Sequence, residues 1–243
     1  MRDGLIITAL SALPRHAASR WMGRAAQSTL SRHAIRLFCA VYQPDLSEVE
    51  QPLASFPTLQ AFFRRPLRPG ARPIADAPLT SPADGTLAAT GLVSGGRYQQ
   101  SEQHHGTVAT LLSRAGDWEG WRYTTVYLSP RDYHRVHAPF SGEVVRLEHV
   151  AGERWPVFAA AVRQLRGLFD NNERLVIELD TGVVVLVGAL GVSEIETALT
   201  VGRRVSAGDE LGSFGFGSTV IVLSAAVPPV VEVGQPVVVG QPL

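Results

Sequence analysis

The chain has 243 residues, 45% of them hydrophobic, which is enough for one large or two modest domains with a real core. Its 22 basic and 22 acidic residues cancel, so no overall charge attracts nucleic acid. The chain contains no lysine and one cysteine, Cys39, which excludes lysine-anchored pyridoxal phosphate, intrachain disulfides and cysteine-cluster metal sites.

The first 41 residues are predicted to be helical and basic, with six arginines against one aspartate, a net charge of +5. One helix face gathers the apolar residues Leu30, Ala34, Leu37, Phe38 and Val41. Such a helix can lie in a membrane interface or pack on its own domain, and the pattern leaves both open. The apolar run Leu5–Leu13 is shorter than the roughly 20 residues that span a bilayer. Pro14 ends this run and the charge before it is weak, which argues against a signal peptide. We expect residues 1–56 to form a membrane-associating segment and linker.

A proline-punctuated connector follows from Gln43. The stretch Leu59–Pro73 reads L-Q-A-F-F-R-R-P-L-R-P-G-A-R-P, and its prolines predict an extended loop. Its arginines could meet lipid phosphates or be solvated, and we expect solvation.

From Ile74 onward the sequence predicts strands, with one helix over Val157–Phe169. The expected strands are Thr86–Val93, Arg122–Leu128, Gly142–Val150, Arg174–Asp180, Val183–Gly188, Ile195–Val201 and Thr219–Leu223. Asp180-Thr181-Gly182 between two apolar runs indicates a hairpin turn.

A weak repeat, V-x-x-G-x-x-L, occurs at Val205–Leu211 and again at Val237–Leu243, and it suggests two similar halves. The expected fold class is α+β, mainly β. It comprises a barrel-sandwich-like catalytic domain of the biotinyl/lipoyl type over residues 57–243, preceded by N-terminal amphipathic helices.

The most informative stretch runs from Phe214 to Leu223. There F-G-F-G-S-T precedes a β-branched apolar run, so a flexible glycine, Gly217, comes just before the small nucleophile Ser218. The Ser218 hydroxyl could therefore reach the Gly217 carbonyl. An isolated G-S-T more often marks only a strand that starts after a turn, so the functional interpretation depends on partners elsewhere.

Two other motifs supply such partners. Ser81–Gly85 reads S-P-A-D-G and contains Asp84, while Tyr133–Pro139 reads Y-H-R-V-H-A-P and contains His134 and His137. A neutral serine becomes a nucleophile beside a base that a third group holds in place. Spacing does not choose between the two histidines. Strand positions three apart face opposite ways, so one of them should face the serine.

Together the three motifs resemble the phosphatidylserine decarboxylase family, pyruvoyl-dependent enzymes of phosphatidylethanolamine synthesis. Further segments match the family in the same order: Leu59–Pro73, Tyr127–Tyr133, Asn172–Arg174 and Val187–Ala189. The resemblance covers nearly the whole chain, and it implies a membrane-associated lyase of phospholipid biosynthesis that is made as a zymogen.

The resemblance also implies autocatalytic cleavage between Gly217 and Ser218. Ser218 Oγ would attack the Gly217 carbonyl and replace the amide by an ester. Elimination then releases the upstream carboxylate, and hydrolysis leaves a pyruvoyl group, the covalent cofactor, at residue 218. The products would be chains of 217 and 26 residues. By the same resemblance, His137 is the base for this step and Asp84 is its orienting carboxylate.

In the second reaction the resemblance implies a Schiff base between the substrate amine and the pyruvoyl carbonyl, followed by loss of CO2. A histidine that titrates near neutrality suits the return of a proton, and the resemblance assigns this role to His134.

The implied partners are phosphatidylserine in an anionic membrane and a heterodimer of the large and small chains. A higher homo-oligomer is left open, and the expected location is peripheral, on the cytoplasmic face of the cell membrane. No nucleic acid and no metal is expected, because His104 and His105 lack a third ligand at metal spacing.

Two segments depart from the family pattern. Ser193-Glu194 stand where the family usually has Gly-Ser, and Gln99–Gly106 lacks a common lysine-glycine pair. Two other classes of protein fit the sequence less well. A swinging-arm carrier on a lipoyl-like barrel would need a lysine to modify, and a zinc peptidase on a related barrel would need an H-x-H pair, whereas this chain has H-x-x-H.

Overall fold

The computed structural model describes residues 15–190, 195–215, 218–225, 227 and 230–243. The predictions for the Leu5–Leu13 run and for Ser193-Glu194 therefore lie outside the described residues, and so does Gly217.

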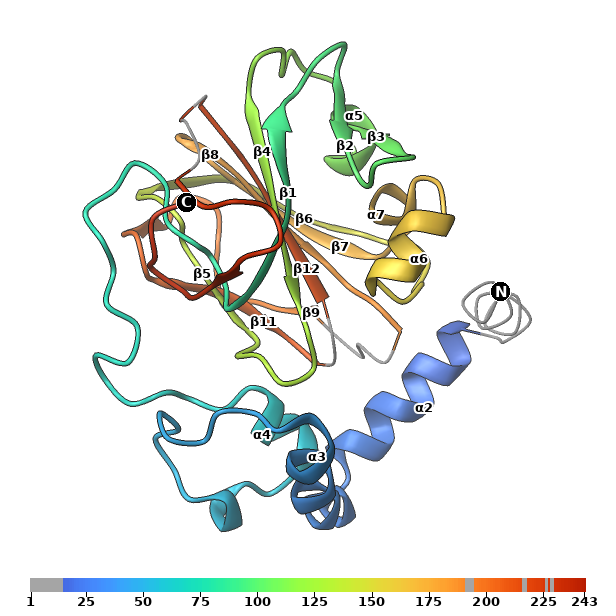
Figure 1. Ribbon diagram of the computed structural model, residues 1–243, viewed down its shortest axis with the longest axis vertical. Helices are drawn as coiled ribbons and strands as arrows, with labels where there is room; N and C mark the ends of the chain where they lie inside the picture. The colour runs from blue at the N-terminus through green and yellow to red at the C-terminus, as the bar shows by residue number, and fades with distance from the viewer. Residues whose placement is uncertain (1–14, 191–194, 216–217, 226, 228–229) are drawn as a thin grey trace.

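A curled antiparallel sheet forms the centre of the molecule (Figure 1), with strand order β10-β6-β7-β8-β12-β4-β1-β13. Its strands are β1 (Gly85–Leu92), β4 (Arg122–Leu128), β6 (Gly142–Val150), β7 (Arg174–Leu179), β8 (Gly182–Val187), β10 (Arg204–Val205), β12 (Ser218–Ser224) and β13 (Pro236–Val237). A smaller sheet has the order β5-β11-β9, formed by β5 (Arg135–His137), β11 (Glu210–Phe214) and β9 (Ile195–Glu196). A separate hairpin joins β2 (Arg97–Gln99) and β3 (His105–Thr107).

The middle strands explain why the sheet forms where it does. Every residue of β8 and β12 is buried, and both strands are rich in β-branched residues. Such runs are typical of strands covered on both faces. The turn at Asp180–Gly182 joins β7 to β8 with Leu179 opposite Gly182, which confirms the predicted hairpin.

Most predicted strands agree with the observed ones within a residue or two, and β4 and β6 agree at both ends. The strand expected over Ile195–Val201 is wrong beyond Glu196. There the Thr197 hydroxyl donates to the Leu211 carbonyl and accepts a hydrogen bond from the Leu199 N–H. These side-chain hydrogen bonds take the place of the backbone hydrogen bonds that would continue the strand.

The single helix predicted over Val157–Phe169 is also wrong. The chain forms two short helices instead, α6 (Ala159–Gln164) and α7 (Leu168–Asn171). Leu165 is extended and Gly167 has a φ of 63°, a left-handed conformation that interrupts helical hydrogen bonding. A third short helix, α5 (Val108–Leu111), contacts α7.

The N-terminal part is helical, as predicted, in its described residues. It comprises α2 (Arg15–Gln27), η1 (Thr29–His33), α3 (Ala34–Tyr42), η2 (Leu53–Ser55) and α4 (Leu59–Phe63). Ile35 and Phe38 of α3 pack with Phe56, Phe62 and Phe63 in a second hydrophobic core, apart from the one around the sheet. Within the described residues, no helix has the length and apolar character needed to cross a bilayer.

The predicted apolar stripe does not pack as one face. Leu30, Leu37 and Val41 are 76%, 66% and 64% exposed, whereas Phe38 is buried. Packing of the whole stripe on its own domain is therefore wrong. The inward face of α3 is formed by Ile35 and Phe38, while Leu37 and Val41 of the same helix point away from the second core.

The V-x-x-G-x-x-L repeat corresponds to a pair of matching turns. Gly208 and Gly240 both have positive φ, 90° and 82°. Their N–H groups donate to the carbonyls of Ala138 and Ser81, at 2.8 and 3.0 Å. A Cβ on either glycine would lie within 2.7 Å of the same Ile74 side chain. The turns therefore need glycine for conformation and for space.

The strands that flank these turns match as well. Val237 of β13 pairs with Gly85 at the start of β1, and Val205 of β10 pairs with Gly142 at the start of β6. The residue before each strand caps the turn: Asp84 accepts the N–H of Val239, and Ser141 accepts the N–H of Ala207, both at 2.9 Å. The two edges of the sheet thus carry matching turns at the positions of the sequence repeat.

Candidate active site

Ser218 is the first residue of β12 and is fully buried. Its Oγ has no hydrogen-bond partner in the described part of the chain. Buried hydroxyls are usually paired, so an unpaired one needs an explanation such as a catalytic role. Ser218 lies opposite Leu128 of β4, and Thr219 lies opposite Tyr127.

His134 lies in the loop between β4 and β5 and is fully buried, with its ring packed on the ring of Phe63 at 4.3 Å between centroids. Its Nδ1 is 2.8 Å from the Asp132 carbonyl oxygen, which can only accept, so Nδ1 carries the proton. Nε2 is then a lone-pair acceptor, and it has no partner among the described residues.

Burial and, to a smaller extent, the nearby charge of Arg65 lower the pKa of His134 to about 3. Titration near neutrality, expected from the sequence, is therefore wrong for this uncut chain. The imidazole is neutral at physiological pH because its cation would sit in a dry pocket beside a guanidinium.

His137 ends β5 and has both ring nitrogens occupied. Nδ1 donates to the Gly208 carbonyl at 2.8 Å, and Nε2 lies 3.2 Å from the Tyr133 hydroxyl. Burial lowers the pKa of His137 and raises that of Tyr133 to about 12, so Tyr133 stays protonated and donates to a neutral ring. The His137 ring is thus fixed with Nε2 as its acceptor.

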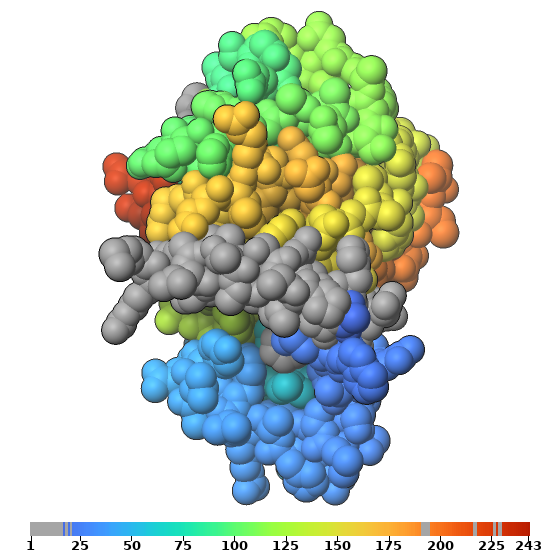
Figure 2. Space-filling view, turned by 90° about the vertical axis from the view of Figure 1, so that its right-hand side faces the viewer, coloured from blue at the N-terminus to red at the C-terminus, as the bar shows by residue number. Residues whose placement is uncertain are grey.

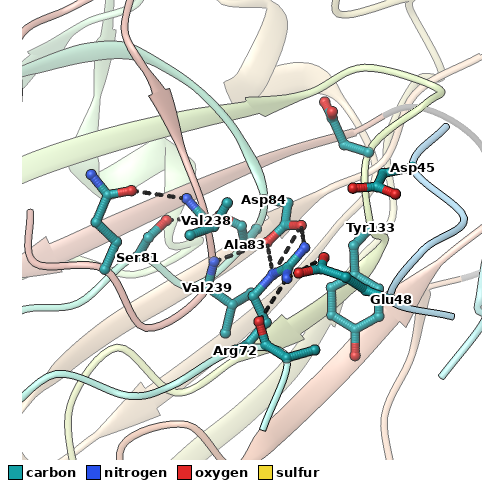
Figure 3. A network of polar contacts seen from close by, with 12 residues as sticks. Asp45, Glu48, Arg72, Ser81, Ala83, Asp84, Tyr133, Val238 and Val239 are labelled. Atoms are coloured by element: carbon teal, nitrogen blue, oxygen red, sulfur yellow. Dashed lines mark hydrogen bonds and ion pairs between the residues drawn. The ribbon is translucent and has the colours of Figure 1, made fainter. Parts of the chain in front are cut away.

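Asp84 is buried and is held by Arg72 (Figure 3). Arg72 Nε lies 2.9 Å from Oδ1, Nη2 donates to Oδ2, and Val239 N–H donates to Oδ1. Glu48 accepts from Arg72 Nη1 at 2.6 Å on the other side. The two acids raise the pKa of Arg72 through these hydrogen bonds and their charge. Asp84, Arg72 and Tyr133 line a cavity of about 250 Å³.

The arginines of the Leu59–Pro73 stretch are not solvated as a group, contrary to expectation. Arg65 is 2% exposed, its Nη2 donates to the carbonyls of Arg131 and Asp132, and its Nε and Nη1 have no partner among the described residues. Arg64 pairs with Glu196. These side chains turn inward because α4 packs under the loop that carries His134.

The structure brings some of the predicted residues together. Phe214 N–H donates to the His134 carbonyl at 3.1 Å, which places the segment before Ser218 against that histidine. The His137 N–H donates to the Pro82 carbonyl at 2.8 Å, so the loop that carries Asp84 lies against β5. Among the described residues, however, no hydrogen bond joins Asp84 to His137, or either histidine to Ser218.

Residues 59–243 match the sequence profile of the family described as Phosphatidylserine decarboxylase. A protein named "Phosphatidylserine decarboxylase proenzyme" from Anaeromyxobacter sp. (strain K) is 39% identical, over 100% of this chain and 99% of its own length. This chain belongs to the phosphatidylserine decarboxylase family. The same name is carried by relatives from Myxococcus xanthus (38% identical, 92% of this chain and 90% of theirs) and Brevibacillus brevis (37%, 87% and 85%).

Among solved structures, the crystal structure of cbpa from L. salivarius REN is 19% identical over 40% of this chain and 53% of that chain. Its TM-score of 0.27 is too low to bear on the fold.

The geometry of the site adds residues that sequence reasoning missed. Arg65, Arg72 and Tyr133 each contact or border Asp84, His134 or His137. Their signal was present: Arg65 and Arg72 lie in the arginine-proline stretch, and Tyr133 opens the histidine motif. Asn172, by contrast, has an architectural role, because its buried amide joins Trp155 to the Gly188 carbonyl.

Proposed function

We propose that this chain is a self-processing phosphatidylserine decarboxylase, which converts phosphatidylserine to phosphatidylethanolamine and CO2. The observation that carries the proposal is Ser218: a fully buried serine after a glycine, with a hydroxyl that has no hydrogen-bond partner among the described residues. Because this hydroxyl has no structural hydrogen bond to break, it is free to attack the backbone carbonyl before it.

Cleavage between Gly217 and Ser218 requires Ser218 Oγ to lose a proton as it attacks the Gly217 carbonyl. We assign the base to His137, with Asp84 in support. In favour of this, His137 is neutral and its Nδ1–H is committed to Gly208, so Nε2 is the basic atom. For Nε2 to act, the Tyr133 hydroxyl must give up its hydrogen bond.

A pyruvoyl group at residue 218 would supply the electron sink for decarboxylation of an amine-bearing substrate. The burial of residue 218 fits such a group, because bulk water is kept from it. His134 has the role of returning the proton. Its Nε2 faces no competing donor among the described residues and carries no proton in the neutral ring, so it would first take a proton from water and then give it to the substrate carbon that has lost CO2. The low pKa of His134 makes the protonated ring a strong acid for this transfer.

The remaining assignments are the membrane and the architecture. Exposed apolar side chains of the N-terminal helices lie among exposed arginines: Trp21, Leu30, Leu37 and Val41 beside Arg24, Arg32 and Arg36. This mixture supports a peripheral position on anionic phosphatidylserine-bearing membrane, at the cytoplasmic face of the cell membrane. Residues 1–56 would form the membrane-associating part. Residues 57–243 would form the catalytic domain, whose matched turns support a barrel-sandwich architecture of the biotinyl/lipoyl type.

Intact-mass analysis of the purified protein tests the proposal. The wild-type chain should separate under denaturing conditions into fragments of 217 and 26 residues that co-purify as a heterodimer when native, and Ser218→Ala should give one chain of 243 residues. An uncut, active wild-type protein would contradict it.

A further inference from the structure

Arg65 is a buried cation to which neither of the two reactions has so far given a role. It follows helix α4 and is 2% exposed. The two acids whose charges act on it, Asp84 and Asp132, form their ion pairs with Arg72 and Arg131 instead. An ionised side chain inside a protein costs free energy unless it is paired. The position of Arg65 therefore needs an explanation other than stability.

The hydrogen bonds of the Arg65 side chain go to the loop that carries His134. Nη2 donates to the carbonyl oxygens of Arg131 and Asp132, at 2.9 and 3.1 Å. The Asp132 carbonyl also accepts the His134 Nδ1–H, at 2.8 Å. A carbonyl oxygen has two lone pairs, so the guanidinium and the imidazole share this acceptor. Arg65 thus holds the atom that decides which nitrogen of His134 carries the proton.

The rest of this loop is held by a turn of its own. The Asp132 N–H donates to the Ser129 carbonyl at 3.0 Å, and Asp132 Oδ2 accepts from the Ser129 N–H and hydroxyl at 2.7 and 2.8 Å. Among the described residues, only Arg65 and His134 donate to the Asp132 carbonyl. Loss of the Arg65 side chain would therefore leave the turn in place and release the carbonyl to change its direction.

The same end of α4 also fixes the plane of the His134 ring. Phe63, the last residue of α4, packs on that ring, and it lies 5.4 Å from the Phe38 ring of α3 between centroids. Helix α4 lies between α3 and the sheet (Figure 1), and Figure 2 shows the N-terminal helices as the blue lower part of the molecule. His134 is thus held at its face and at Nδ1, while Nε2 has no partner among the described residues.

We propose that Arg65 is a positioning residue for decarboxylation: by holding the Asp132 carbonyl, it keeps the proton of His134 on Nδ1 and leaves Nε2 to carry the proton that the substrate receives. The inference rests on the proposed function for the role of His134. In each turnover Nε2 takes a proton from water and gives it to the substrate carbon, so the ring returns to its neutral Nδ1–H form. A ring with its proton on Nε2 could not take up that second proton there.

The first test observes the His134 proton in the uncut Ser218→Ala chain. Long-range nitrogen–proton NMR correlations of histidine-labelled protein show which ring nitrogen is protonated, and His134→Gln assigns the signals. We expect the Nδ1–H form in Ser218→Ala and a clear gain of the Nε2–H form once Arg65→Met is added. Arg68→Met is the matched control, because Arg68 is an exposed arginine of the same stretch. It should keep the Nδ1–H form. A ring that stays wholly Nδ1–H in the Arg65→Met chain would overturn the proposal.

The second test separates positioning from folding, with kcat and KM measured per cut chain. Arg65→Met should lose about tenfold or more in kcat with little change in KM, because the lost group acts through His134 and not on the bound substrate. Arg65→Lys keeps a charged donor on a side chain of similar length and should recover most of the loss. The melting temperature of Arg65→Met should change little, because the variant also removes a buried charge. A lower melting temperature with unaltered kcat would show a purely structural arginine.

These results are distinguishable from failure of the proposed function. If wild-type protein decarboxylates phosphatidylserine and Arg65→Met keeps both its kcat and the Nδ1–H form, the positioning role alone is wrong. If the His134 proton moves in the uncut Arg65→Met chain but wild-type protein does not decarboxylate phosphatidylserine, the proposed function fails and the control of His134 by Arg65 stands.

Discussion

Arg72 donates hydrogen bonds to the carboxylate of Asp84 from two nitrogens, Nε and Nη2. The Nε atom lies 2.9 Å from Oδ1 and 3.2 Å from Oδ2. Glu48 holds the remaining side of the same guanidinium. Because Glu48 belongs to the connector after α3, Arg72 links this connector to Asp84 (Figure 3). The orientation of Asp84 is therefore set jointly by the catalytic domain and by the segment before it.

The first prediction concerns this contact. Arg72→Gln leaves a buried carboxylate with the Val239 N–H and a weaker neutral donor, so we expect self-cleavage to slow about tenfold or more. The free energy of unfolding should fall by about 1.5–3 kcal/mol, the range for hydrogen bonds to charged groups. Time-resolved denaturing gels and urea unfolding measure the two effects. Glu48→Gln is the control: it keeps Arg72 on Asp84 and should cut at close to the normal rate. Unimpaired cleavage in Arg72→Gln would show that Asp84 needs no such support.

The second prediction separates the two histidines. His137→Ala and Asp84→Ala should accumulate the uncut chain, with cleavage slowed about 10²–10⁴-fold, the usual contribution of a positioned base. His134→Ala should cut but lose decarboxylation. The exposed His149 provides a control, and His149→Ala should do both reactions normally. A His134→Ala protein with full turnover would remove His134 from the mechanism.

The third prediction follows from the depressed pKa of His134. Between its ordinary pKa of 6.5 and its folded pKa of about 3, the unfolded chain binds a proton that the folded chain does not. Stability is therefore complete above the unfolded pKa and falls as the pH drops below it, by about 2 kcal/mol at pH 5. His137 acts in the same direction. Urea unfolding of Ser218→Ala at about pH 8 and pH 5 measures this loss. A Ser218→Ala/His134→Gln chain should lose less over the same interval, and an equal loss would contradict the assignment.

The fourth prediction concerns the carbonyl group. The active enzyme should show no pyridoxal absorbance and should be inactivated by hydroxylamine. Borohydride should inactivate it when phosphatidylserine is present, because reduction traps the lipid amine. Mass spectrometry should find the adduct on residue 218 of the 26-residue fragment. An adduct on the larger fragment, or activity that survives both reagents, would rule out a pyruvoyl enzyme.

The fifth prediction concerns the membrane. Leu37→Glu and Val41→Glu change exposed residues of α3 without touching its packed face, so they should reduce pelleting with anionic vesicles and leave folding intact. Leu92→Glu introduces the same charge at an exposed apolar residue on the sheet and should pellet normally. Removing residues up to about Ser55 would be a poorer test, because Phe38 would be lost from the second core. Undiminished pelleting of the double α3 variant would move the contact elsewhere.

Much of the sheet could be predicted from sequence because its signal is local. Gly142–Val150 and Arg122–Leu128 have the β-branched content and flanking turns of strands, and both were predicted at their observed ends. The helix over Val157–Phe169 failed because Gly167 adopts a left-handed conformation that composition alone does not reveal. The short strands β10 and β13 were missed because two residues carry no periodicity.

The sequence indicates candidate residues for the site but not the contacts that these residues make. Ser218, Asp84 and the two histidines stand in recognisable motifs, but the partner of Asp84 depends on where a distant loop packs. The pKa of His134 likewise depends on Phe63 and Arg65, which approach it only after α4 has docked. The charge pattern predicted that the arginines of the Leu59–Pro73 stretch are solvated, because a charge pattern does not show that the loop packed against them is buried.

Ser141 does for its turn what Asp84 does for the matching one, since each offers a side-chain oxygen to an N–H just before a left-handed glycine. A neutral hydroxyl is thus sufficient for folding at this place in the architecture. A carboxylate there is surplus to stability and must be neutralised by a guanidinium of its own. The two turns therefore allow a comparison within one chain: the edge of the sheet at Ser141 has a neutral cap, and the edge at Asp84 has a charged cap that Arg72 must balance.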